Sequence, residues 1–179
     1  MRIISGSARG KKLLTVEGLD IRPTLDRVKE SIFNMIMFDL ADSSVLDLFC
    51  GSGALGIEAL SRGAKNAVFV DNNKMSLDVT QKNLISSMLY EKAKLILSDS
   101  LAFLKSTNDK FDIIFIDPPY ESELYENALS LIYEKKLLKP EGKIIVELDK
   151  VKTPEFNTGG FKVLKDKSYG RVKILIMKE

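Results

Sequence analysis

The sequence contains no histidine and only one cysteine, Cys50, among its 179 residues. Without histidine, the usual general base of hydrolytic triads and the usual nitrogen ligand of metal sites are both missing. A single cysteine can form neither an intramolecular disulfide nor a paired-thiol redox or zinc site. We therefore expect no metal centre. The chemistry should depend on carboxylates, hydroxyls, backbone groups or a cofactor, in a reducing compartment.

Long apolar runs and a strong charge bias are missing as well. No run approaches the roughly 20 residues that span a bilayer, and the chain turns polar at Ser5 before a signal-peptide core can form. These features predict a cytoplasmic protein without a membrane segment. The 27 Lys and Arg residues nearly balance 25 Asp and Glu residues, for a formal charge of +2. This balance excludes a histone-like polycation and an acidic tail protein.

From about residue 44 onward, short apolar runs alternate with segments of helical period. This order is typical of an α/β, Rossmann-like fold, in which helices cover both faces of a mostly parallel sheet and ligands bind at the carboxyl ends of the strands. After residue 150 the alternation stops, and two runs flanking residues 168–170 predict an antiparallel hairpin at one sheet edge. The predicted strands are 45–49, 67–70, 94–97, 111–116, 143–146, 161–167 and 172–177, and the predicted helices are 54–62, 74–88, 100–105 and 124–136.

Residues 1–43 precede this alternating pattern. They include an amphipathic helix predicted over residues 25–38, with Pro23 and Thr24 as its start and an apolar face. The chain shows no linker or repeat, so we expect a single domain over 1–179, with segment 1–43 packed on a core of 44–179. The residues of the apolar helix face are Val28, Ile32, Phe33 and Ile36.

A glycine-rich loop joins the first core strand to the next helix. Gly51, Gly53 and Gly56 satisfy G-x-G-x-x-G, and Asp71 follows 20 residues after Gly51. Glycines allow a ligand to approach the backbone closely, and a carboxylate at the end of the second strand can accept both hydroxyls of a ribose. This pattern is compatible with NAD.

The charge beside the loop favours a different cofactor. Asp47 lies four residues before Gly51, where it would repel a pyrophosphate but attract a cation. S-adenosylmethionine carries a sulfonium and an ammonium and no phosphate, so it is the favoured cofactor. Asp99, after the third strand, is a candidate to accept from the adenine amine. Its alternative role is that of N-cap for the following helix, and the two roles are compatible.

Asp117-Pro118-Pro119-Tyr120 follows the fourth strand and is the most informative motif. The prolines stiffen the turn and leave the Pro118 carbonyl free as an acceptor beside Asp117. Two adjacent acceptors suit a donor with two hydrogens, such as the exocyclic amine of a base, and Tyr120 provides a ring for stacking. The alternative is a rigid turn that merely ends the strand.

These residues predict a direct displacement at the amine nitrogen. The lone pair of an aromatic amine is delocalised into its ring, so the amine is a poor nucleophile. Hydrogen bonds to Asp117 and the Pro118 carbonyl would favour a pyramidal nitrogen with its lone pair directed at the methyl group, and positioning would supply most of the catalysis. Asp117 would also stabilise the developing positive charge, and the proton would leave through Asp117 or water.

Together with the glycine loop, this motif resembles class I S-adenosylmethionine-dependent amino-methyltransferases, and more narrowly the RsmD family of bacterial methyltransferases acting on guanine N2 of 16S ribosomal RNA. The resemblance spans nearly the whole chain. Two features depart from the family: no tryptophan lies near Ser7-Ala8, and Cys50 replaces a common alanine. The segments that carry the resemblance are 22–30, 46–56 and 58–64, together with Asp117-Pro118-Pro119-Tyr120.

The resemblance implies a seven-stranded fold and roles for individual residues. Thr24 and Arg27 would help close the cofactor site, Asp71 would hold the ribose, and Asp99 would read the adenine. The candidate catalytic residues are Asp117, Pro118 and Tyr120. The candidate cofactor-binding residues are Thr24, Arg27, Asp47, Phe49, Gly51, Gly53, Asp71, Asn72, Asp99, Ser100 and Asp117. The candidate substrate-binding residues are Pro119, Tyr120, Arg9, Lys11, Lys12 and Tyr169.

The expected partner is ribosomal RNA within a small-subunit assembly particle, bound by a monomer. Little of the chain lies outside the core, so recognition would depend on RNA shape and an extruded base. A DNA adenine-N6 methyltransferase would share the Asp-Pro-Pro-Tyr motif, and the choice of guanine over adenine rests on the resemblance alone. A non-catalytic RNA-binding protein and an NAD-dependent dehydrogenase are further alternatives. Further candidate phosphate contacts are Arg2, Lys162, Lys165, Lys167 and Arg171.

Overall fold

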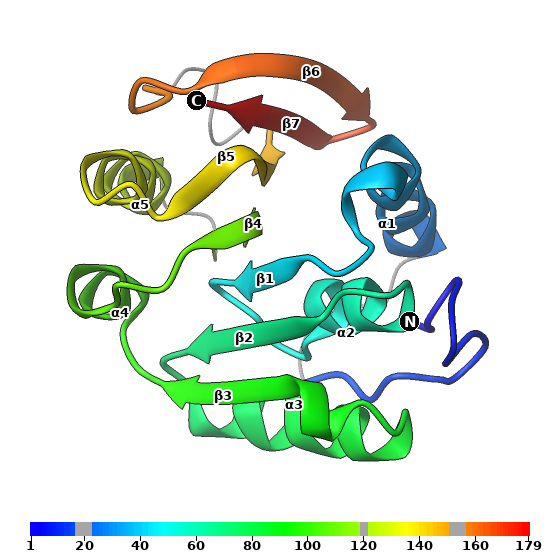
Figure 1. Cartoon of the computed structure of the whole chain (residues 1–179). Helices are drawn as coiled ribbons and strands as arrows, with labels where there is room; N and C mark the ends of the chain where they lie inside the picture. Colours follow the sequence, from blue (N-terminus) through cyan, green and yellow to red (C-terminus); the bar gives the residue numbers. More distant parts are fainter. Residues whose placement is uncertain (17–22, 119–121, 151–156) are drawn as a thin grey trace.

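The computed structural model describes residues 1–16, 23–118, 122–150 and 157–179, with the side chains of residues 23–25 and 122 left undescribed. A seven-stranded sheet in the order β3-β2-β1-β4-β5-β7-β6 crosses the molecule (Figure 1). The strands are β1 (Ser44–Asp47), β2 (Asn66–Asp71), β3 (Ala93–Leu97), β4 (Phe111–Ile116), β5 (Leu138–Asp149), β6 (Lys162–Tyr169) and β7 (Val172–Lys178). The helices are α1 (Pro23–Met35), α2 (Ala54–Ser61), α3 (Lys74–Ser86), α4 (Ser100–Ser106) and α5 (Ser122–Glu134), with short 3-10 turns η1 (Met37–Asp39) and η2 (Tyr90–Lys92).

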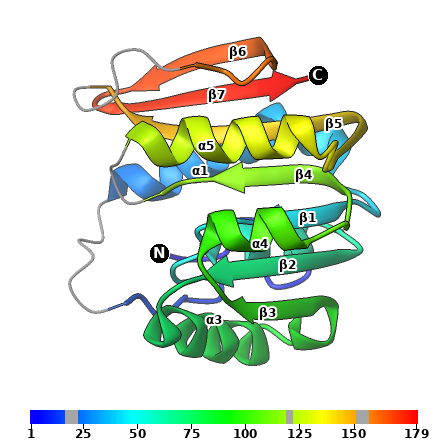
Figure 2. The ribbon, with the colours of Figure 1, turned by 90° about the vertical axis from the view of Figure 1, so that its left-hand side faces the viewer.

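Strands β1 to β5 run parallel, and β7 runs antiparallel between β5 and β6. In Figure 2 the arrowheads of β2, β3 and β4 point to one side and that of β7 to the other. The strand order reverses between β1 and β4, so the carboxyl ends of these two strands flank the switch point where ligands of such sheets bind. The predicted Rossmann-like fold with its antiparallel hairpin is confirmed.

Helices cover both faces of the sheet because each central strand is apolar on both sides. Helices α1, α2 and α3 share one apolar cluster with alternate strand residues such as Phe115 and Ile145. Helices α4 and α5 share the other cluster with Ile116 and Val146. The apolar face predicted for α1 is buried as expected, and the Phe33 ring packs 5.7 Å from the Phe115 ring. This alternation fixes the face to which each residue at the strand ends belongs.

Most boundaries differ by one to three residues from the sequence-based expectation, and three of the differences concern strands named in the site prediction. Strand β1 ends at Asp47, so Leu48 and Phe49 belong to the turn that leads into the glycine loop. Strand β5 has 12 residues, because pairing with β4 begins at Leu138. Tyr169 lies in β6 rather than in the hairpin turn, which Gly170 makes at a φ of 60°.

The first 13 residues fold back on themselves and pack on α2. Arg2 and Lys12 form an antiparallel bridge, and Ile3 is fully buried. Gly6 has a φ of 86°, and a Cβ atom there would lie 1.8 Å from the Ser61 carbonyl oxygen, so only glycine fits. The N-terminal segment is therefore seated on the α1–α3 face of the core.

The carboxylate of Glu58 on α2 ties this segment to the core. It is fully buried, and it accepts hydrogen bonds from the backbone N–H of Ile4 at 2.8 Å and of Ser5 at 3.0 Å. It also pairs with Lys29 Nζ at 3.2 Å and with Arg62 Nε at 2.8 Å. Burial lowers the pKa of Lys29, and the Glu58 charge opposes that shift.

No helix among the described residues is long and apolar enough to cross a bilayer.

Candidate active site

Acidic residues gather at the carboxyl ends of the parallel strands. Asp47 ends β1, Asp71 ends β2, and Asp117 directly follows β4. Burial raises the pKa of Asp47, and the negative charges of Asp117 and Asp71 add to this shift, as expected for carboxylates at one edge of the sheet. The structure thus brings together residues that lie up to 70 positions apart in the sequence.

Asp47 lies beneath the glycine loop. Only 3% of its surface is exposed, and one oxygen accepts the backbone N–H of Gly56 at 2.9 Å. Burial raises the pKa of Asp47 to about 7, although the Gly56 hydrogen bond opposes the shift. A bound cation would favour the ionised form, so this site gains electrostatic stabilisation when a positively charged group occupies it.

Asp71 holds the other end of the loop. Its Oδ2 accepts the backbone N–H of Gly51 at 2.9 Å, and its Oδ1 accepts that of Asn73 at 2.8 Å. Each carboxylate oxygen can accept a second hydrogen bond, so Asp71 retains capacity for ribose hydroxyls. Gly53 has a φ of 78°, and a Cβ atom there would lie 2.7 Å from Thr80 Cγ2. The loop therefore requires glycine both for its backbone and for its packing.

Two side chains of α3 support the loop from below. The Thr80 hydroxyl donates to the Gly51 carbonyl at 2.9 Å. The fully buried Asn83 amide donates to the Ser52 carbonyl at 2.9 Å and to the Leu14 carbonyl at 3.0 Å. Asn83 therefore links the N-terminal segment to the loop. Sequence reasoning missed both residues, because nothing in the α3 sequence indicates what its buried polar groups contact.

The loop contacts argue against a dinucleotide. The amides of Gly51 and Gly56, which would be expected to face a pyrophosphate, already donate to the carboxylates of Asp71 and Asp47. A pyrophosphate would find these donors occupied and would meet negative charge. The geometry is suited to a cofactor that brings positive charge, as the sequence predicts.

Asp117 lies where β4 ends, beside this loop. Its side chain has surface open to solvent, yet desolvation by the surrounding protein raises its pKa to about 7. The exposed surface leaves Asp117 accessible to a ligand. Pro118 is buried, whereas Pro119 and Tyr120 lie outside the described residues.

Asp99 and Ser100 stand at the start of α4, after β3. Asp99 is the N-cap, and its Oδ1 accepts the backbone N–H of Ala102 at 2.8 Å. The N-cap alternative is confirmed, and the adenine contact stays a prediction. The Ser100 hydroxyl is buried and donates to the Leu48 carbonyl at 2.8 Å, so it braces the turn after β1.

The remaining cofactor candidates occupy the rim of the same edge or α1. Phe49 is half-buried against the α4–α5 cluster, and Asn72 is exposed directly after β2. Arg27 is exposed on α1, and Thr24 belongs to the first turn of α1 with its side chain outside the described residues. The cofactor contacts expected for these four residues stay predictions.

The candidate RNA contacts are divided between two regions. Arg9, Lys11 and Lys12 are exposed on the N-terminal segment, and the lysines of β6 are exposed on the edge strand. Tyr169 is partly buried against the α1–α3 cluster, and its hydroxyl forms a hydrogen bond with Ser31. These contacts give Tyr169 a packing role, and its predicted part in substrate binding is untested.

Cys50 is a structural residue. It is 7% exposed within the apolar cluster, as expected for a thiol in place of a small apolar side chain. Burial raises the pKa of the Cys50 thiol, with the charges of Asp47 and Asp71 adding to the shift. The thiol stays protonated and is unsuited to act as a nucleophile.

Sequence reasoning missed one acid of the carboxyl edge, Glu147 on β5. It is half-buried, and burial together with the negative charge of Asp117 raises its pKa to about 8. Its signal was present, because Glu147 follows the apolar run 143–146 as Asp117 follows 113–116. Glu147 and Asp117 repel each other when both are ionised, so they lose their protons in two coupled steps.

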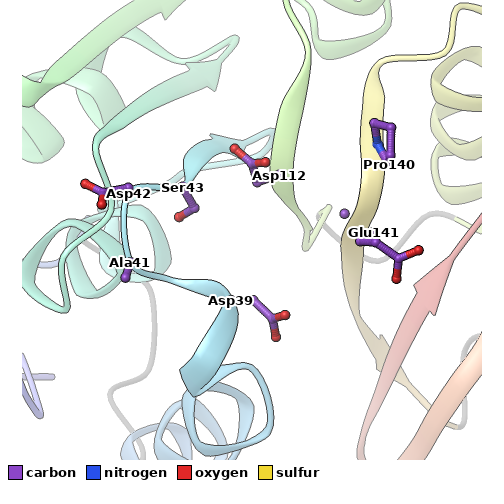
Figure 3. Close-up of a pocket in the computed structure, with 8 residues that line it drawn as sticks. Asp39, Ala41, Asp42, Ser43, Asp112, Pro140 and Glu141 are labelled. Carbon is purple, nitrogen blue, oxygen red and sulfur yellow. The ribbon is translucent and has the colours of Figure 1, made fainter.

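A hollow of about 190 Å³ lies at the amino ends of the parallel strands, with Ser43 before β1 and Asp112 near the start of β4 among its lining residues (Figure 3). It is lined by Asp39, Asp112 and Glu141, among others. Lys139 pairs with Asp112 at 2.8 Å, and Lys143 pairs with Asp39. Lys178 pairs with Glu141 at 3.7 Å, so the three named acids each have a cationic partner. Among the described residues, no cluster of three acids or thiols is placed to hold a metal.

The comparison with known proteins decides the family. A family model described as Conserved hypothetical protein 95 matches residues 1–178. The chain belongs to this family. It is 42% identical over 175 residues to Ribosomal RNA small subunit methyltransferase D of Haemophilus influenzae, covering 96% of this chain and 90% of that protein. The predicted resemblance to the RsmD family is thereby confirmed.

Two further relatives agree with this assignment. The putative rRNA methyltransferase YlbH of Bacillus subtilis is 39% identical over 183 residues, covering 100% of this chain and 99% of that protein. A solved structure described as a putative methyltransferase from Escherichia coli superposes with a TM-score of 0.88 at 31% identity, covering 99% of this chain and 96% of that one. The family fold is a class I methyltransferase fold, and the seven-stranded sheet of this chain matches it.

Proposed function

We propose that this chain transfers a methyl group from S-adenosylmethionine to the exocyclic N2 amine of a guanine in small-subunit ribosomal RNA. The observation that carries the proposal is the placement of Asp117 and Pro118 directly beside the acid-lined glycine loop, at the switch point of the sheet. The names of the relatives support methyl transfer to ribosomal RNA. The choice of guanine N2 comes from the family resemblance.

The edge of the sheet fits the charge of this cofactor. Asp47, Asp71 and Asp117 supply negative charge, and the loop amides of Gly51 and Gly56 are already satisfied. When bound, S-adenosylmethionine supplies an electrophilic methyl group on a sulfonium. We assign the ribose hydroxyls to Asp71 and the adenine amine to Asp99. The proposed pocket is completed by Thr24, Arg27, Phe49, Asn72 and Ser100.

Asp117 and the Pro118 carbonyl hold the target amine by its two N–H groups. This grip favours a pyramidal nitrogen with a lone pair available for attack. The ionised Asp117 stabilises the positive charge that develops on the nitrogen, and afterwards it accepts a proton or passes it to water. With a pKa raised to about 7, Asp117 is a stronger base than an ordinary aspartate, which suits it to this role. Pro119 and Tyr120 complete the substrate site.

Calorimetry together with a transfer assay tests this proposal. We expect S-adenosylhomocysteine to bind and NADH to produce no heat of binding. Ribosomal particles incubated with a labelled methyl donor should acquire label at a guanine, to be mapped by nuclease digestion and mass spectrometry. Binding of NADH alone would support a dehydrogenase. Label at an adenine of DNA would support the alternative methyltransferase, and RNA binding without label would support a non-catalytic RNA-binding protein.

We infer the setting of the reaction as well. Residues 1–179 act as one domain, with segment 1–43 and core 44–179, and a monomer acts on an assembling small-subunit particle in the cytoplasm. The exposed Arg9, Lys11 and Lys12 lie on a segment that Asn83 links to the glycine loop. We assign these three residues to phosphate contacts near the cofactor site, and their exposure supports the assignment.

Replacing Lys11 and Lys12 by alanine should weaken RNA binding and make it less sensitive to salt. The plot of log affinity against log salt has a negative slope, and its magnitude should decrease by about 0.7 to 0.9 for each phosphate that the protein no longer neutralises. Fluorescence anisotropy over a salt series measures this slope. The matched control replaces Lys105 and Lys110, two exposed lysines outside the proposed RNA-binding region, and should leave the slope unchanged. An equal slope in both double variants would exclude the N-terminal segment as the RNA-binding surface.

A further inference from the structure

The register of the sheet places a second carboxylate beside Asp117. Ile116 of β4 pairs with Val146 of β5 in parallel, so the next residues, Asp117 and Glu147, are neighbours at the carboxyl edge. Adjacent strands lie about 4.8 Å apart, so side chains from both strands can contact the same ligand. The charge of Asp117 acts on Glu147, which agrees with this proximity.

Alternation along β5 fixes the face on which Glu147 lies. Val146 and Leu148 belong to the α4–α5 cluster, whereas Ile145 belongs to the α1–α3 cluster. Glu147 therefore lies on the same face as Ile145. Ile174, which pairs with Glu147 from the neighbouring strand β7, is fully buried in the α1–α3 cluster as well. Asp47, two positions beyond Val45, lies on this face too. The carboxylates of β1 and β5 thus flank Asp117 on one face of the sheet.

Among the described residues, no contact of the Glu147 side chain explains an acid at this position. Within the described part of the chain, no side chain forms an ion pair or hydrogen bond with its carboxylate, and only its backbone carbonyl accepts the Tyr125 hydroxyl, at 2.9 Å. A half-buried carboxylate beside a second carboxylate is unfavourable unless a ligand compensates for it. An acid held there at a cost to the free protein points to a donor on the substrate.

We propose that the Glu147 carboxylate accepts the N1–H of the target guanine, next to the amine held by Asp117 and Pro118, and thereby selects guanine over adenine. This inference rests on the proposed function. Guanine presents N1–H and its exocyclic N2 amine side by side. These adjacent donors match the adjacent acceptors of Glu147, Asp117 and the Pro118 carbonyl. Adenine presents a bare N1 lone pair beside its amine, and an ionised carboxylate has no hydrogen to donate to it. Because the pKa of Glu147 is raised to about 8, this selection is expected above that pH, where the carboxyl is ionised. Discrimination is large when a buried polar group is left unpaired by the wrong base.

The test uses 2-aminopurine, which keeps the amine at C2 but has a lone pair at N1. Synthetic RNAs carry guanine or 2-aminopurine at the mapped target, in the free or particle form that the mapping shows to be methylated. For the wild-type protein above pH 8, where Glu147 is ionised, we expect kcat/KM to be about 10–100-fold higher with guanine, because 2-aminopurine lacks one hydrogen bond to a charged group. In Glu147→Gln this preference should shrink at least about tenfold, because the glutamine amide can also donate to a bare N1.

Two controls make the result specific. Glu141→Gln changes an exposed acid at the other end of β5 and should keep the wild-type preference. Binding of S-adenosylhomocysteine shows that each variant is folded. If Glu147→Gln fails to bind it, Glu147→Asp, which keeps the charge but withdraws it by one methylene, is tested in its place and should also lose preference.

The outcomes separate the two proposals. Methylation of neither RNA by the wild-type protein would overturn the proposed function. Methylation of the guanine RNA with no preference over 2-aminopurine would overturn the role of Glu147 alone. So would a preference that survives in Glu147→Gln, because the discrimination would then come from another part of the base, such as O6.

Discussion

Replacing Asp117 by alanine should lower kcat for methyl transfer by about 10²–10⁴-fold, while the affinity for S-adenosylhomocysteine stays within roughly tenfold of the wild-type value. The expected loss is in kcat because Asp117 acts most strongly on the charge that develops on the amine nitrogen in the transition state. Single-turnover transfer of a labelled methyl group, with calorimetry for the cofactor product, measures both quantities.

Asp117→Asn refines this prediction. Asparagine keeps one acceptor oxygen but has no charge and cannot take a proton, so we expect a rate between those of the wild type and the alanine variant. The matched control is Asp109→Ala, an exposed acid before the amino end of β4, which should leave the rate unchanged. Full turnover by Asp117→Ala would refute the role assigned to this residue.

Replacing Glu58 by alanine should lower the free energy of unfolding by about 3–5 kcal/mol. Glu58 is fully buried and holds Lys29, Arg62 and two backbone N–H groups of the N-terminal segment. The substitution leaves Lys29, itself 3% exposed, without its carboxylate partner. Urea denaturation monitored by circular dichroism measures the change. Glu30→Ala, an exposed acid on α1, should change stability by less than about 0.5 kcal/mol.

A double variant separates charge from backbone anchoring. Lys29→Met with Glu58→Leu removes both buried charges and should recover part of the lost stability, because a buried ion pair can often be replaced by apolar packing. It should not recover all of it, since the N–H groups of Ile4 and Ser5 still lose their acceptor. An unfolding free energy of Glu58→Ala within about 1 kcal/mol of the wild-type value would contradict this account.

The local motifs could be predicted because their residues are close in sequence. The Asp47 to Gly56 loop and the Asp117-Pro118 turn each follow an apolar strand, and the signal is contained in a few positions. The order of strands and helices was equally predictable, since alternating patterns leave few topologies for a parallel sheet. The ends of β1 and β5 were less predictable, because pairing with neighbouring strands determines where a strand stops.

Glu147 and Glu58 were not recognised, for the same physical reason. Their roles depend on partners from other parts of the chain: Asp117 lies 30 positions before Glu147, and Ile4 lies 54 positions before Glu58. A glutamate in a strand or a helix has no local signature that distinguishes a solvated acid from a buried one. Only the register of β4 with β5, and the seating of the N-terminal segment on α2, create those environments.

The sequence by itself determined the fold class, the family and the charge of the cofactor that the loop prefers, because periodicity and short motifs encode strands, turns and the acids at their ends. The tertiary structure decided how those acids are used. It turned Asp47 and Asp71 inward to the loop amides, left Asp117 exposed, and set Glu147 beside it. The physical reason is that burial and charge coupling depend on distance in space, and only the folded sheet fixes that distance.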